Sequence, residues 1–148
     1  MKTPSTSVPH ILLVDDNRDG LLVRRLLLEE MGCRVEVAVD GEEGLKLFES
    51  SNFDVVVVDY RMPRMNGVEM IARVRAKDAT ARIILLSSVV EPLGLTEENT
   101  GADVVIAKNA AEPTHLARSI KRLLNRAPLR KPPGRQKGGA PRARAMAR

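Results

Sequence analysis

Short apolar runs rich in branched residues recur along most of the chain. The four strongest are Ile11–Val14, Val55–Val58, Ile83–Leu86 and Val104–Ile106. A weaker alternating stretch, Arg34–Val39, lies between the first two. Continuous apolar runs of this length are typical of strands buried on both faces of a parallel sheet. A buried helix would give similar runs, but their shortness and their valine and isoleucine content favour strands.

The segments between these runs have the spacing of amphipathic helices. In the segment 18–31 an apolar stripe is predicted, which Gly32 ends. Its members are Leu22, Val23, Leu26, Leu27 and Met31. Two further helices are predicted around 44–48 and 68–74. In the last helix Pro113 fits the first turn. The apolar face of that helix has regular helical spacing and comprises Leu116, Ile120, Leu123 and Leu124.

The segment 89–100 has the weakest helical pattern. It contains Pro92 and Gly94, and its apolar spacing is irregular, so a short or frayed helix is predicted there. Strand and helix patterns therefore alternate five times. This order predicts a single α/β domain over 9–126, in which helices cover both faces of a parallel sheet.

Charge divides the chain into two parts. The formal net charge is +5, but residues 127–148 hold seven basic residues and no acidic one, which leaves 17 basic and 19 acidic residues in 1–126. The basic character thus belongs to a proline- and glycine-rich tail, predicted to be disordered, and residues 1–8 are predicted to be flexible. The tail could be a solvated extension, a nonspecific nucleic-acid contact or a docking segment for an acidic partner.

Several protein classes are disfavoured. The single cysteine, Cys33, cannot form an intramolecular disulfide, and no Cys/His cluster has metal-finger spacing. The apolar runs are far shorter than the roughly 20 residues that a membrane helix needs, and the start of the chain lacks the apolar core of a signal peptide. No membrane insertion and a cytoplasmic location are therefore expected. With no tryptophan and few other aromatic residues, platforms for base stacking are also missing.

Polar side chains follow the predicted strands where each strand ends. Asp15 and Asp16 follow the first strand, Asp59 the third, Ser87 the fourth and Lys108 the fifth. The carboxyl ends of parallel strands meet at one edge of a sheet, so these groups are expected to converge. Each alone has a simple structural explanation, such as a helix cap. Three carboxylates in one pocket, however, repel one another unless a cation lies among them, and oxygen ligands suit Mg²⁺.

Four segments carry a resemblance to a known family: Ile11–Asn17, Val55–Gly67, Ile83–Ser88 and Gly101–Lys108. Together they resemble the receiver domain of bacterial two-component response regulators, over about residues 9–126. The most specific motif is DYRMPRMNG, which begins at Asp59. The resemblance implies a flavodoxin-like, doubly wound (βα)5 fold with a five-stranded parallel sheet in the order 2-1-3-4-5.

The resemblance also implies roles for the acidic residues. Asp59 matches the phosphoacceptor, which takes a phosphoryl group from a histidine kinase or a histidine phosphotransfer protein, and it is also a metal ligand. Asp16 matches the direct ligand of Mg²⁺ (or Mn²⁺), and Asp15 the acid that acts largely through metal-bound water. Arg61 occupies the position that contributes a backbone carbonyl to the metal. Gly67 is expected to adopt a backbone conformation that other residues resist.

Ser87 matches the family's switch hydroxyl, and Lys108 the lysine that pairs with the phosphoryl group. Two positions depart from the family pattern. Val105 stands where the family has a tyrosine or phenylalanine that swings inward, and Asn109 stands where a proline usually follows the lysine. A trans peptide is expected before Asn109, because a cis bond to a residue other than proline costs about 2.5–4 kcal/mol. The phosphorylation site therefore looks intact while the usual output region looks altered.

The resemblance implies a stand-alone response regulator receiver. Such a protein is a phosphoacceptor that promotes its own phosphorylation and dephosphorylation, is not a turnover enzyme and signals through protein–protein contacts. Two alternatives stay open. One is a phosphorelay intermediate that passes the phosphoryl group to another histidine protein, and the other is a pseudo-receiver that acts as a binding module.

Overall fold

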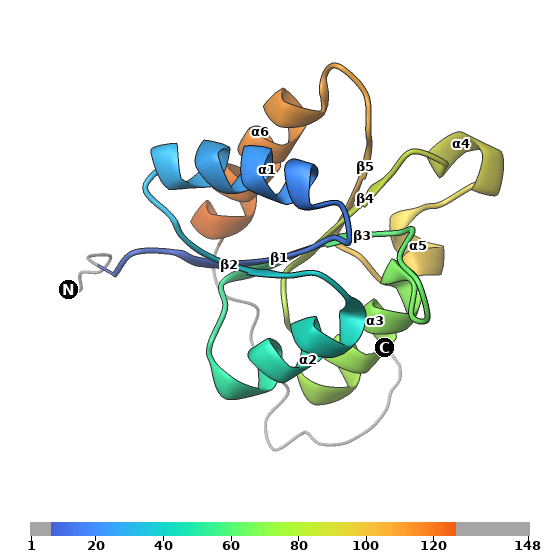
Figure 1. The fold of residues 1–148 in the computed structure, drawn as a ribbon, viewed down its shortest axis with the longest axis horizontal. Helices are drawn as coiled ribbons and strands as arrows, with labels where there is room; N and C mark the ends of the chain where they lie inside the picture. Colours follow the sequence, from blue (N-terminus) through green and yellow to red (C-terminus); the bar gives the residue numbers. More distant parts are fainter. Residues whose placement is uncertain (1–6, 127–148) are drawn as a thin grey trace.

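The computed structural model describes residues 7–126, in which five strands alternate with helices (Figure 1). The strands are β1 (His10–Val14), β2 (Arg34–Ala38), β3 (Val55–Asp59), β4 (Ile83–Ser87) and β5 (Val104–Ala107). The helices are α1 (Arg18–Glu30), α2 (Gly41–Ser50), α3 (Gly67–Lys77), α4 (Val90–Leu93), α5 (Glu97–Thr100) and α6 (Glu112–Asn125). Of the flexible segment predicted over 1–8, residues 1–6 lie outside the described residues, as does the predicted tail 127–148.

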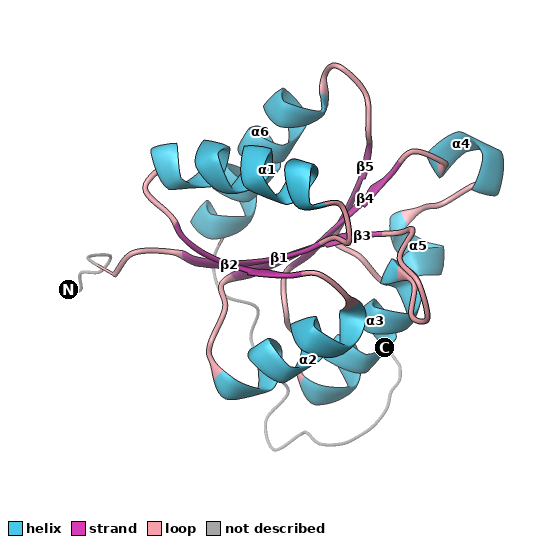
Figure 2. Ribbon diagram, viewed as in Figure 1, coloured by secondary structure: helices cyan, strands magenta, loops and turns pink. Residues whose placement is uncertain are grey.

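The strands form one parallel sheet in the order β2-β1-β3-β4-β5, which confirms the predicted topology. Helices α1 and α6 cover one face of the sheet, and α2 and α3 cover the other (Figure 2). Successive residues of β1 alternate between the two cores, with Ile11 and Leu13 facing α1 and α6 and Leu12 and Val14 facing α2 and α3. This burial on both faces explains why the strands read as continuous apolar runs.

The apolar face predicted for α1 is wrong at three of its five positions, whereas Leu27 and Met31 are partly buried against the core. Leu22, Val23 and Leu26 are more than half exposed, and the buried positions are Leu21, Arg24 and Leu28. These three positions have the i, i+3, i+7 spacing of one helix face. The middle position is Arg24, so a pattern of apolar residues alone does not identify this face as the buried one. The result is an outward leucine and valine surface on a helix whose inner face carries a buried charge.

The connection between β4 and β5 holds two four-residue helices, which agrees with the short helix expected there. Gly94 adopts a positive φ of 62° between them, in a region that favours glycine. Thr96 then caps α5 by accepting a hydrogen bond from the Asn99 amide at 3.1 Å. In the last helix, Leu116, Ile120 and Leu123 are buried as predicted. Within the described part of the chain no helix is long and apolar enough to cross a membrane.

Candidate functional site

The predicted acidic residues meet at the carboxyl edge of the sheet. Asp15 directly follows β1, and Asp59 is the last residue of β3, the neighbouring strand. Asp15, Asp16 and Asp59 each present a carboxylate oxygen, and these oxygens lie within 4.8 Å of one another. Asp15 and Asp59 are buried, whereas Asp16 is exposed. The cluster therefore combines two buried carboxylates with a third that is open to solvent.

Asp59 is 4% exposed and makes two polar contacts through different oxygens. Its Oδ1 pairs with the Lys108 ammonium, and its Oδ2 accepts a hydrogen bond from the Arg61 backbone amide at 3.1 Å. Burial raises the pKa of the Asp59 carboxyl above its ordinary value; the hydrogen bond from Lys108 opposes this rise and the charge of Asp15 adds to it. A cation beside this carboxylate therefore favours its ionised form.

Asp15 is held by residues that the sequence prediction did not single out. Its Oδ1 accepts from the Asn17 amide at 2.9 Å, and its Oδ2 accepts from Arg24 Nη1 at 2.9 Å and lies 3.5 Å from Lys108 Nζ. Arg24 in turn forms a bidentate pair with Glu112, the first residue of α6. The only sequence signal was the place of Arg24 three residues after Leu21, on the inward face of α1.

Ser87 lies at the end of β4, beside the strand that carries Asp59. It is 1% exposed, and its Oγ accepts a hydrogen bond from the Val89 amide at 3.0 Å. Lys108 follows the next strand, and its amide donates to the Ser87 carbonyl at 2.9 Å. The hydroxyl and the ammonium are thus linked through backbone at the same edge as the acids, as the strand-end pattern predicted.

The loop between β3 and α3 begins directly after Asp59, and in it the role expected for Gly67 is wrong. The residue with a positive φ in this loop is Arg64, at 69°. Gly67 is instead required by close packing, because an added Cβ would lie 2.6 Å from the Asp59 carbonyl oxygen and 2.7 Å from Leu85 Cδ1. Asn66 caps α3 through a reciprocal pair of hydrogen bonds with Glu69.

The two departures from the family pattern are accommodated by local contacts. The Val105 amide donates to Glu97 Oε2 at 3.1 Å, which ties β5 to α5. Asn109 forms a turn by accepting the Ala111 amide at 2.8 Å, and its carbonyl accepts the Glu112 amide at 3.0 Å. The described residues contain no cis peptide bond, so the bond before Asn109 is trans, as expected.

The donor set fits a hard divalent cation. The cluster offers three carboxylates and no sulfur or imidazole, and Mg²⁺ prefers oxygen ligands while keeping several water molecules. Because the Asp16 side chain is exposed, water can reach a cation held at this cluster. The Arg61 side chain is exposed and carries a cationic guanidinium, which does not ligate metals, so only the backbone carbonyl of Arg61 could contribute to a metal site.

Comparison with known proteins gives a consistent picture. The family model described as "Response regulator receiver domain" matches residues 11–121. A gliding motility regulatory protein of Myxococcus xanthus is 33% identical over 134 residues, which cover 83% of this chain but 17% of that protein. The chain spans less than half the length of the first curated relatives that it matches.

Solved structures resemble the whole described fold. A CheY-like receiver domain from Methanospirillum hungatei has a TM-score of 0.73 and 29% identity, covering 80% of this chain and 95% of that one. A response regulator of Thermotoga maritima, crystallised in complex with Mg²⁺ and BeF, has a TM-score of 0.70 and 32% identity, covering 78% of this chain and 99% of that one. The fold, the strand-end acids and these matches show that the chain belongs to the response regulator receiver domain family.

Proposed function

We propose that the chain accepts a phosphoryl group on Asp59 in a Mg²⁺-dependent reaction and signals through protein contacts. The observation that carries the proposal is the pairing of the buried Asp59 carboxylate with Lys108 beside two further carboxylates. A structural ion pair would need one acid and one base. Here three acids meet two cations, Lys108 and Arg24, and the three carboxylates suit a bound divalent cation; together these positive charges would neutralise a phosphoryl group on Asp59.

The chemical step is an in-line displacement at phosphorus. An oxygen of the ionised Asp59 carboxylate attacks the phosphohistidine of a kinase or phosphotransfer protein. The new O–P bond forms as the N–P bond breaks, and the electron pair of that bond stays on the imidazole nitrogen, which takes up a proton from water. The chain is then a stoichiometric acceptor, since Asp59 itself is modified.

The residues around Asp59 neutralise and orient the phosphoryl group. Lys108 is positioned to pair with its oxygens, because its ammonium already lies against Asp59 Oδ1. Ser87 can donate its hydroxyl proton while its Oγ keeps the hydrogen bond from Val89. Asp15, Asp16 and Asp59 would hold Mg²⁺, which supplies positive charge against the phosphoryl oxygens when it is bound.

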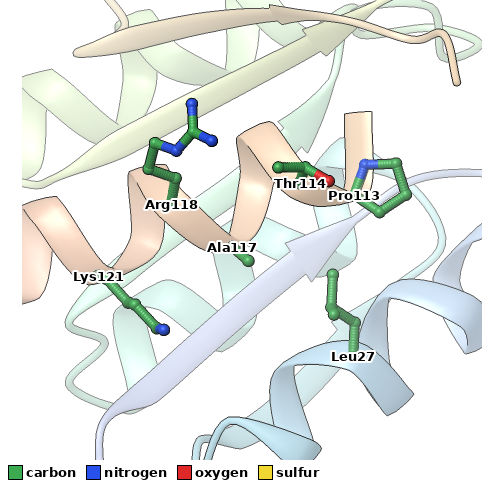
Figure 3. A pocket seen from close by; sticks show the side chains of 6 residues that line it. All are labelled: Leu27, Pro113, Thr114, Ala117, Arg118 and Lys121. Carbon is green, nitrogen blue, oxygen red and sulfur yellow. The ribbon is translucent and has the colours of Figure 1, made fainter. Parts of the chain in front are cut away.

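The surface of α1 next to the site suits a protein donor of the phosphoryl group. Leu22, Val23 and Leu26 are 57%, 61% and 54% exposed, and α1 begins two residues after Asp16. Beside this patch a groove separates α1 from α6, lined by Leu27 on one side and by Pro113, Thr114, Ala117, Arg118 and Lys121 on the other (Figure 3). Exposed apolar groups bordered by cations favour a helical partner with an acidic rim.

A second candidate function is relay of the phosphoryl group to another histidine protein. The observation that favours it is the region 89–105. There, the chain forms two four-residue helices, in agreement with the short helix predicted, and Val105 stands at the position where the family has an aromatic residue. A relay needs the acceptor chemistry but no conformational output. Amide chemical shifts of residues 89–114 that stay unchanged after phosphorylation would favour the relay, and shifts across this surface would favour output by contact.

The acceptor residue can be mapped directly. Phosphoramidate, which carries the same N–P bond type as phosphohistidine, is incubated with the full chain and Mg²⁺, and the product is reduced with borohydride. An acyl phosphate on aspartate becomes homoserine, which peptide mass spectrometry locates. We expect homoserine at position 59 and none in Asp59→Asn. Homoserine at Asp15 or Asp16, or none in the wild-type chain, would contradict the assignment.

A further inference from the structure

Arg24 is a charged residue on the buried face of a helix. It lies between Leu21 and Leu28 on the side of α1 that packs against the sheet, and it is 9% exposed. Burial alone lowers the pKa of the Arg24 guanidinium, but Glu112 and Asp15 more than reverse this effect and the pKa is raised. A buried cation in this position is stable only while both partners stay charged and in place.

The guanidinium joins the acidic cluster to the start of α6. Its Nε and Nη2 donate to the two Glu112 oxygens at 3.0 and 3.1 Å, and its Nη1 donates to Asp15 Oδ2 at 2.9 Å. Gly20 leaves the space that this bridge occupies, because an added Cβ would lie 2.9 Å from Arg24 Nη1. The bridge therefore has a fixed geometry and two competing anionic partners, one of which belongs to the metal-binding cluster.

The charges of Arg24 and Glu112 are expected to have opposite effects on the affinity of the acidic cluster for a divalent cation. A positive charge bound to Asp15 repels a divalent cation that uses the same carboxylate cluster, and Glu112 offsets that repulsion by drawing on the same guanidinium. Glu112 stands four residues after Lys108, so the pair also fixes the start of α6 near the second cation of the site. The net charge of the Arg24–Glu112 pair is zero when both members are present, and loss of either member alone leaves one unpaired charge.

We propose that the Arg24–Glu112 pair sets the Mg²⁺ affinity of the acidic cluster, with Arg24 as a positioning residue that weakens cation binding and Glu112 as its counter-charge. This inference rests on the proposed function, because it takes the cluster as the Mg²⁺ site. It assigns opposite effects to the two members of one ion pair. Loss of structure alone would not separate them in this way.

The test is a Mg²⁺ titration of the ¹⁵N-labelled full chain, followed by amide chemical shifts, which needs no phosphodonor. Glu112→Gln leaves the Arg24 charge on Asp15 and is expected to weaken Mg²⁺ binding by about tenfold. Arg24→Met removes the competing cation and leaves Glu112, so it is expected to tighten binding by a similar factor. The double variant Arg24→Met with Glu112→Gln is expected to return close to the wild-type affinity.

The neighbouring arginine provides a matched control. Arg25 points outward on the same helix and pairs with Glu29 at 3.1 Å, with both side chains more than 40% exposed. Arg25→Met therefore removes the same charge and is expected to change Mg²⁺ affinity by less than about twofold. Urea unfolding of each variant without Mg²⁺ verifies that it is folded at the conditions of the titration.

The outcomes separate the two proposals. Opposite shifts in the two single variants would support the inference, whereas equal losses in both, or wild-type affinity in both, would overturn it and leave the proposed function standing. If Arg24→Met does not fold, the double variant Glu112→Gln with Arg24→Lys takes its place. Lysine keeps the positive charge, so Mg²⁺ affinity should stay as weak as in Glu112→Gln alone. Recovery of the wild-type affinity in this double variant would overturn the inference. Absence of Mg²⁺ binding by the wild-type chain would overturn both proposals.

Discussion

Gly67 offers a sharp test of how the fold positions Asp59. Gly67→Ala places a methyl group 2.6 Å from the Asp59 carbonyl oxygen and 2.7 Å from Leu85 Cδ1. Both distances are far inside van der Waals contact. Leu85 can rotate, but the carbonyl belongs to the backbone of β3, so relief of the clash must move either the end of that strand or the start of α3.

The size of the effect follows from these neighbours. Overpacking a close-packed interior costs about 1–3 kcal/mol, and the upper half of that range applies because a backbone atom must give way. The gain in helix propensity from glycine to alanine, up to about 1 kcal/mol, offsets part of this cost. A net loss of about 2 kcal/mol is expected, which corresponds to roughly 6–10 °C in Tm for a domain of this size.

The assay is urea unfolding followed by far-ultraviolet circular dichroism, with Gly41→Ala as the matched control. Gly41 is the first residue of α2, as Gly67 is of α3, and both are buried. The three atoms nearest to a Cβ on Gly41 all belong to the flexible side chain of Met65, with Sδ at 2.8 Å, so the cost of Gly41→Ala is expected to stay below about 1 kcal/mol. Equal midpoints for Gly67→Ala and the wild-type chain would refute the packing argument.

Three further predictions concern the site and its surface. Without divalent cation, Asp59→Asn is expected to unfold at a higher urea concentration at neutral pH. Because the pKa of Asp59 is raised in the folded state, the ionised carboxylate destabilises the fold at pH values above that pKa. The stability advantage of Asp59→Asn over the wild-type chain should therefore shrink as the pH falls through this pKa, and an advantage that stays constant with pH would contradict the prediction. Leu22→Ala with Leu26→Ala is expected to slow phosphotransfer from a phosphohistidine protein at least several-fold while leaving acetyl phosphate reactivity unchanged; slowing of both would argue against a docking role. Arg61→Asn is expected to shorten the lifetime of the phosphoryl group a few-fold, measured by loss of the adduct mass, because an amide there can orient an attacking water.

The strands and the acidic cluster could be predicted because their signals are local. A run such as Val55–Val58 has few uses other than a doubly buried strand, and the residue after such a strand must lie at the carboxyl edge of the sheet. Asp15, Asp59 and Lys108 were therefore brought together correctly by counting strand ends. The pattern needed no knowledge of side-chain packing.

The inner face of α1 and the role of Gly67 could not be predicted in the same way. Arg24 is buried because Glu112 and Asp15, 88 and nine residues away, neutralise it, and helical periodicity contains no information about such partners. Leu22 and Leu26 looked like core residues because they are apolar, but exposure of a leucine depends on which stripe packs against the sheet. Gly67 is fixed by a neighbouring strand rather than by its own φ, which only the assembled fold reveals.

The central claim is that Asp59 accepts a phosphoryl group with the help of Mg²⁺. The most direct measurement is the intact mass of the full chain after incubation with acetyl phosphate, alongside a metal-chelated sample and Asp59→Asn. We expect a single phosphoryl adduct that requires both Mg²⁺ and Asp59. An adduct that persists in Asp59→Asn or after chelation, or no adduct on a chain shown separately to bind Mg²⁺, would contradict it.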